Sequence, residues 1–198
     1  MADITATMVK ELRDRTGVGM MECRKALIEA DGNVDNAIKF LRERGISKAE
    51  SKSQRSTKEG LIFSYIHFNG KIGVLLELNC ESDFVARTDE FKALAEEIAL
   101  QIAAMSPLAI TAGDIDPEII DREKEIARNK ALLEKKKPEI VEMIVEGNIR
   151  KYCSEHALME QSLISDEKRT IKDLLTEAIS KTGENIQIAR FVRYALGE

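Results

Sequence analysis

The chain has 198 residues, which is enough for one ordinary domain and one small domain. Its hydrophobic fraction of 43% is that of a globular protein, and the 33% of charged residues mixes both signs, which suits exposed helical faces. The net charge of −5 lacks the positive excess of a protein that works on nucleic acid, so we expect no direct nucleic-acid partner.

The N-terminal residues and the cysteines favour a cytoplasmic protein. Residues 1–5 have neither a basic region nor an apolar run, so we expect no secretory signal. No apolar run approaches the roughly 20 residues that cross a bilayer, so we expect no membrane partner. The three cysteines, Cys23, Cys80 and Cys153, are dispersed, which is typical of reduced cytosolic thiols.

Residues 1–54 are predicted to form a first domain, a bundle of three short helices. Three apolar stripes of helical period follow one another with short loops between them, in residues 6–15, 20–30 and 34–41. Each is followed by a glycine that we expect to end the helix: Gly17, Gly32 and Gly45. Residues 46–59 are rich in Ser and Lys and predict a linker whose first half can be helical.

Residues 55–198 are predicted to form a second domain around an antiparallel sheet. Residues 61–68 and 72–78 are rich in β-branched and aromatic side chains, and they flank Asn69-Gly70, a strong hairpin signal because both residues tolerate positive φ. Residues 185–196 predict a final strand. Together with the bundle, this sheet and the helices around it predict an α+β fold.

The helices of the second domain can also be placed from the pattern. Thr88 suits an N-cap, and the stripe behind it is expected to be buried: Phe91, Leu94, Ile98, Ile102 and Met105. Charge dominates residues 117–137, and Pro138 separates them from a second apolar-periodic segment that ends near residue 158. We therefore expect a charged helical hairpin at about 117–156, followed by a last helix at 171–181.

The sequence offers little for covalent chemistry. Its only histidines are His67 and His156, and His67 has no cysteine or acidic partner at the spacing of a metal site. Cys80 lies near Asp83, but a nucleophilic cysteine also needs a base, and neither histidine is placed to serve as one. We expect no enzyme, no cofactor and no metal site. An enzyme that uses Cys80 and Asp83 is the weaker alternative.

The second predicted helix carries an additional apolar strip. Its main stripe is made of Cys23, Ala26, Leu27 and Ala30. At 100° per residue, Met21 falls about 160° from the centre of that stripe, and Ile28 falls beside Met21 one heptad later. The strip either packs on the rest of the chain or docks a partner, and composition alone leaves both interpretations open. Flexible methionine suits a docking surface.

Residues 79–87 form a second unusual feature. A predicted strand ends there, and a polar, acidic segment carries the aromatic Phe84 beside the charged Asp83 before the next helix begins. From the pattern alone, the favoured interpretation is that Phe84 fills a corner of the core while Asp83 caps a turn. The other interpretation is that this pair contacts a partner.

Both features belong to segments that resemble the elongation factor Ts family, the nucleotide exchange factors of bacterial translation elongation. The resemblance runs over essentially the whole chain and is most specific in two segments, RTGVGMMECRKAL at residues 15–27 and ELNCESDFVAR at residues 77–87. The family usually has Thr where Ser82 stands here. Serine keeps the hydroxyl and lacks one methyl group, so we expect little consequence.

The resemblance implies a partner and a mechanism. The bundle, similar to a ubiquitin-associated-type domain, is expected to dock on the GTPase domain of elongation factor Tu through four residues: Leu12, Met20, Met21 and Ile28. An exchange segment, Ser82, Asp83, Phe84 and Val85, is expected to insert near the magnesium and phosphate region of the GTPase, so that GDP leaves. The alternative function is a ubiquitin-associated-type adaptor that binds a protein without exchange activity.

Compact members of the family resemble homodimers built through the core sheet. No cysteine lies near the end of this sequence, where Val192 and Tyr194 occupy the predicted last strand. Any homodimer of this chain is therefore expected to be non-covalent.

Overall fold

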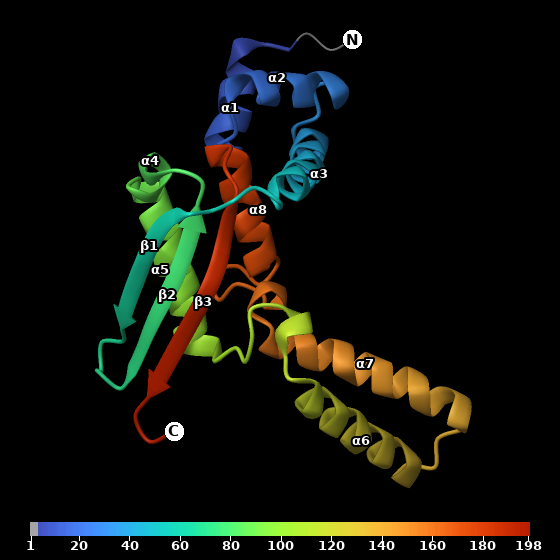
Figure 1. Cartoon of the computed structure of the whole chain (residues 1–198). Coiled ribbons are helices and arrows are strands. Elements are labelled where there is room, and N and C mark those ends of the chain that lie inside the picture. Colours follow the sequence, from blue (N-terminus) through green and yellow to red (C-terminus); the bar gives the residue numbers. More distant parts are fainter. Residues whose placement is uncertain (1–3) are drawn as a thin grey trace. The chain divides into compact units, whose positions relative to one another are not determined.

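The computed structural model describes residues 4–198 and confirms the α+β class. A three-stranded sheet has the order β1-β2-β3, and Figure 1 shows β2 running antiparallel to both neighbours. The strands are β1 Glu59–Ile66, β2 Ile72–Cys80 and β3 Ile186–Ala195. The helices are α1 Ala6–Thr16, α2 Met20–Glu29, α3 Val34–Lys52, α4 Asp83–Ala86, α5 Asp89–Met105, α6 Pro117–Leu133, α7 Pro138–His156 and α8 Ile171–Thr182, with short 3-10 turns η1 Ala112–Asp114 and η2 Leu158–Glu160.

The described residues divide into two compact units. The first contains residues 4–62, 77–94 and 173–189, and the second contains residues 63–76, 95–172 and 190–198. The predicted boundary at 54–55 stays a prediction, and the first three residues of that predicted domain lie outside the described residues. Across residues 4–198, none of the helices combines the length and the apolar character that a bilayer crossing requires.

The predicted three-helix bundle is confirmed. Thr5 caps α1 by accepting a hydrogen bond from the Met8 amide at 3.3 Å, and Gly17 ends that helix with a left-handed φ of 67°. The bundle core is formed by Val9, Leu12, Cys23, Ala26, Leu27, Ala37 and Leu41. The members from α2 and α3 are core-facing residues of the stripes predicted in residues 20–30 and 34–41, so the helical period places that part of the core correctly.

The prediction that Gly45 ends the third helix is wrong. Helix α3 continues through Gly45 to Lys52, and Gly45 is buried inside it. A Cβ atom at Gly45 would lie 3.8 Å from both Thr176 and Ser180 of α8, so this glycine lies in a helix–helix contact within the first unit. The packing of that helix face outweighs the cost of about 1 kcal/mol that a glycine imposes inside a helix.

The predicted hairpin and the helix that follows it are also found. The His67 amide donates to the Ile72 carbonyl at 2.9 Å across the turn, where Gly70 alone of the Asn69-Gly70 pair takes a positive φ. Thr88 accepts from the Phe91 amide at 3.2 Å at the start of α5. The predicted stripe of α5 is buried except for Met105, which lies in the last turn of the helix and is exposed.

Helices α6 and α7 form the predicted helical hairpin and lie side by side in Figure 1. Small and β-branched side chains fill the space between them: Ala127, Ala131, Val141 and Val145. On the outside, Arg128 forms two hydrogen bonds of 3.0 Å to the carboxylate of Glu142. The hairpin therefore has a thin apolar seam and a charged surface, as the composition of this segment predicts.

Gly147 offers a stability test in this hairpin. It is exposed within α7, and a Cβ atom there would meet nothing within 4 Å. We expect Gly147→Ala to raise the free energy of unfolding by about 0.5–1 kcal/mol, because alanine lowers the entropy of the unfolded chain and favours helix. Denaturant unfolding measures the change.

Gly70→Ala is the matched control. A Cβ atom at Gly70 also meets nothing within 4 Å, but the residue has φ +67°. The left-handed backbone costs an L-residue about 1–2 kcal/mol, so Gly70→Ala is expected to lower the free energy of unfolding. Equal effects of the two substitutions would contradict the backbone argument.

Candidate partner-binding site

The segment between β2 and α5 is a short helix where the sequence predicts an irregular stretch. Helix α4 has four residues, and Ser82 caps it, with its Oγ accepting a hydrogen bond from the Val85 amide at 3.4 Å. The side chain of Phe84 is 79% exposed. The interpretation that Phe84 fills a core corner is therefore wrong, because α4 buries none of its four side chains.

Asp83 is the first residue of this short helix, and the cap is Ser82, so the interpretation that Asp83 caps a turn is wrong. The Asp83 carboxylate lies 2.8 Å from the Arg87 guanidinium one turn later, and both side chains are substantially exposed. Such a pair contributes little to stability in water, but it orients the carboxylate beside Phe84. At the other end, the Thr88 hydroxyl donates to the Val85 carbonyl at 2.8 Å. Asp83 and Phe84 thus form an accessible acidic and aromatic pair.

Two acidic residues that the sequence reasoning missed hold this segment in place. Glu184 accepts hydrogen bonds from the Ser82 amide at 3.0 Å and from the Ser82 hydroxyl at 2.6 Å. In return, Glu81 accepts from the Asn185 amide at 2.6 Å. The end of β2 lies beside the start of β3 in the antiparallel sheet, which brings residues about 100 positions apart together. Glu184 could have been found only from the pairing of the last strand with β2, and local sequence patterns do not show which strands pair.

Cys80 lies beside this segment as a buried residue. Its thiol donates a hydrogen bond to the Ser82 carbonyl at 3.1 Å. Burial, and then the nearby charge of Glu184, raise the pKa of the Cys80 thiol. A nucleophilic cysteine needs the opposite shift, so the geometry gives no support to an enzyme that uses Cys80 and Asp83.

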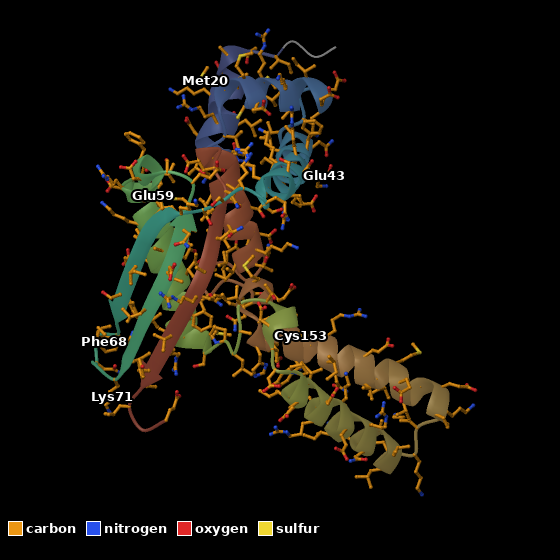
Figure 2. All side chains as sticks on the ribbon, viewed as in Figure 1. Met20, Glu43, Glu59, Phe68, Lys71 and Cys153 are labelled. Atoms are coloured by element: carbon orange, nitrogen blue, oxygen red, sulfur yellow. The ribbon has the colours of Figure 1, made fainter. Side chains whose placement is uncertain are left out.

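The apolar strip on α2 faces away from the bundle core, as predicted. Met21 is 66% exposed and Ile28 is 50% exposed, while the opposite face of the helix is fully buried. Met20, labelled in Figure 2 at the start of α2, is also exposed. The interpretation that the strip packs on the rest of the chain is wrong for the described residues. Its role in docking a partner stays a prediction.

Leu12, the fourth predicted docking residue, requires a correction. Its side chain is fully buried in the bundle core. Leu12 lies on α1 and points into the core, where a partner cannot reach it, so it supports the bundle from inside. The predicted docking surface is therefore reduced to Met20, Met21 and Ile28.

Glu22 fixes the helix that carries the strip. Its carboxylate lies 3.3 Å from Lys48 Nζ and 3.3 Å from an Arg44 guanidinium nitrogen, both on α3, and 3.8 Å from Lys25 Nζ. Burial acts to raise the pKa of Glu22, but the hydrogen bond from Lys48 and the three positive charges outweigh it, and the net shift is downward. Glu22 is thus held ionised, and it ties α2 to α3 next to Met21.

Comparisons with known proteins identify the family of the chain. The family model described as "Elongation factor TS" matches residues 6–198. The elongation factor Ts of Fervidobacterium nodosum is 53% identical over 196 residues, which cover 99% of this chain and all of that protein. The proteins of the same name from Thermosipho melanesiensis and Oleidesulfovibrio alaskensis are each 54% identical, over 98% and 100% of this chain and the whole of each relative.

These matches extend over the sheet, the bundle and the helical hairpin alike. They define the chain as an elongation factor, a protein of translation. It belongs to the elongation factor Ts family, which confirms the resemblance drawn from residues 15–27 and 77–87.

Proposed function

We propose that this chain is a guanine-nucleotide exchange factor that binds elongation factor Tu in its GDP form and promotes GDP release. The α2 strip docks on the GTPase, the Asp83-Phe84 pair inserts near the nucleotide, and the magnesium site is disturbed. The chain acts by binding and displacement, in the cytoplasm, and catalyses no covalent step of its own. Membership of the elongation factor Ts family supports this proposal.

The observation that carries the mechanism is the exposure of Phe84 on a segment braced by hydrogen bonds. A free-standing aromatic ring is unfavourable in water, and its complete burial in a partner contributes about 2 kcal/mol. The hydrogen bonds to Ser82 matter because ordering a mobile segment on binding costs free energy and so lowers the affinity for the partner. A pre-ordered phenylalanine beside a carboxylate is therefore suited to insert into the partner. We call Phe84 in this role the wedge.

The thermodynamics of exchange sets the size of the effect required. Coupling is reciprocal, so the factor weakens GDP binding by the same ratio as GDP weakens binding of the factor. A weakening of about 10⁴-fold corresponds to about 5.5 kcal/mol of differential binding. The wedge supplies part of this. A carboxylate near the magnesium adds more, because the ion is a large charge that bridges phosphates and protein.

The central experiment follows release of a fluorescent GDP from elongation factor Tu, with excess unlabelled GDP present. We expect the chain to raise the release rate in a saturable manner. Binding without acceleration would support the alternative, a ubiquitin-associated-type adaptor. To test the magnesium step, the same assay is run after chelation of Mg²⁺, where the acceleration by the chain is expected to shrink because part of its effect is already present.

Substitutions in the α2 strip are expected to change the concentration of chain that gives half-maximal GDP release. The double substitution Met21→Ala and Ile28→Ala should raise the concentration of chain that gives half-maximal release about tenfold or more, because it removes two apolar contacts worth about 1 kcal/mol each. The maximal rate should change little, since the wedge is intact. The release assay measures both parameters.

The chain offers a closely matched control for the strip. Met143 is 71% exposed and Ile126 is 56% exposed, and both lie on helices of the hairpin. Replacing this pair with alanine removes the same atoms from equally exposed helical positions and should leave both parameters unchanged. Equal effects of the two double substitutions would show that the strip is not a specific docking surface.

A further inference from the structure

Helix α4 has little support of its own. It contains four residues and buries none of them. A single turn of helix is unstable in isolation, because nucleation fixes several dihedral angles for each hydrogen bond gained. The position of Phe84 must therefore be determined by residues outside the helix.

Glu184 provides that support with both carboxylate oxygens. One accepts from the Ser82 amide at 3.0 Å, and the other accepts from the Ser82 hydroxyl at 2.6 Å. The same hydroxyl oxygen accepts from the Val85 amide, so Glu184 fixes the direction of the capping group. Hydrogen bonds to a carboxylate are short and about twice as strong as neutral ones, and a chain of them is mutually reinforcing.

Glu184 is itself held at the junction of α8 and β3. Gly183 turns the chain with φ 78°, and the Glu184 amide donates to the Thr182 hydroxyl at 3.3 Å. The next residue, Asn185, is buried, and its side-chain amide donates to the Arg55 carbonyl at 2.9 Å. The carboxylate thus belongs to an ordered junction, and Ser82 is the group that it positions.

We propose that Glu184 is a positioning residue of the exchange segment: it holds Ser82 so that Phe84 is presented to the partner in one ordered geometry. This inference rests on the proposed function. Without Glu184, the segment samples several conformations, and the partner must select the productive one, which lowers the rate of insertion. The hydrogen bonds of Glu184 go to Ser82 and Thr182, whereas the predicted docking strip lies on α2, so docking should be preserved.

The test is the fluorescent-GDP release assay with Glu184→Ala. We expect the maximal release rate to fall about tenfold, as is typical for loss of a hydrogen bond to a charged group, while the half-saturating concentration stays within about twofold. Ser82→Ala should lower the maximal rate in the same way, and Ser82→Thr, which keeps the hydroxyl, should lie closer to the natural chain. The control is Glu146→Ala, an exposed carboxylate on α7.

Combining the substitutions shows whether Glu184 acts through the segment. The double variant Ser82→Ala with Glu184→Ala should be no slower than the slower single variant, because each single substitution already breaks the same hydrogen-bonded pair. Phe84→Ala should give the same rate with or without Glu184. Additive losses in either pair would overturn the inference. Glu184→Gln, which retains the side-chain shape, replaces Glu184→Ala if that variant does not fold.

The outcomes separate the inference from the function on which it rests. If Phe84→Ala slows release but folded Glu184→Ala does not, Glu184 has no positioning role and the exchange mechanism stands. A rise in the half-saturating concentration alone would also contradict a positioning role. If neither substitution slows release, the wedge mechanism itself is wrong.

Discussion

Replacing Phe84 with alanine is expected to lower the maximal rate of GDP release that the chain induces by about 100-fold, the effect of losing one central interface anchor. The free energy of unfolding should change by no more than about 0.5 kcal/mol, because the ring is mostly exposed and packs on no core. The half-saturating concentration should change less than the rate, since the α2 strip still docks.

The measurement combines stopped-flow release of fluorescent GDP with denaturant unfolding of the same preparations. Leu133→Ala is the control, because Leu133 is as exposed as Phe84 but lies at the end of α6, in the second unit. It should leave the release rate unchanged. A Phe84→Ala protein that folds normally and releases GDP at the natural rate would exclude the wedge, whatever the chain does at other surfaces.

The exposure of Phe84 could not be predicted from the local sequence pattern. An aromatic residue after a strand is usually buried, so the pattern alone favours a core role. The exposure of Phe84 follows from two facts that a local window does not contain: α4 is one turn long, and its anchor is Glu184, more than 100 residues away in sequence. The resemblance to a family identified the segment but gave no reason for its geometry.

More of the fold than of the site could be predicted from the sequence, because most helices and strands follow from local hydrophobic periodicity. The bundle, the hairpin strands and the α6–α7 hairpin follow from stripes of period 3.6 or 2 and from capping residues such as Thr5 and Thr88. Gly45 marks the limit of this approach. Gly17 and Gly45 look alike in sequence, yet Gly17 ends a helix with a positive φ of 67° and Gly45 lies inside one, packed on Thr176 and Ser180 of α8.

The α2 strip and the exchange segment divide the proposed work between them. In the proposed mechanism, Met21 and Ile28 are expected to add affinity for the GTPase equally with and without nucleotide. Affinity that is equal for both states cannot shift an equilibrium. Only contacts made better in the nucleotide-free partner can weaken GDP, and the Asp83-Phe84 pair is the candidate for these. Substitutions in the strip should therefore act on half-saturation, and substitutions in the segment should act on maximal rate.

Substitutions of Leu12 test whether this residue supports the bundle core or contacts the partner. Leu12→Ala is expected to lower the stability of the bundle by about 3 kcal/mol, because it removes a fully buried leucine from a small core that cannot collapse to fill the cavity. Amide hydrogen exchange in α1, α2 and α3 measures this loss directly, since it reports opening of the bundle even when other parts of the chain stay folded. Leu133→Ala, on an exposed helical position, should leave that exchange unchanged.

The effect of Leu12 on docking should follow from the opening of the bundle alone. Leu12→Met nearly conserves volume and should cost less than about 1.5 kcal/mol, so the bundle stays folded and half-saturation in the release assay stays near that of the natural chain. Leu12→Ala should raise half-saturation only under conditions where hydrogen exchange shows the bundle open. If a folded Leu12 variant instead docked poorly, the partner would have to open the core of the bundle on binding, and the strip of Met20, Met21 and Ile28 would not be the whole docking surface.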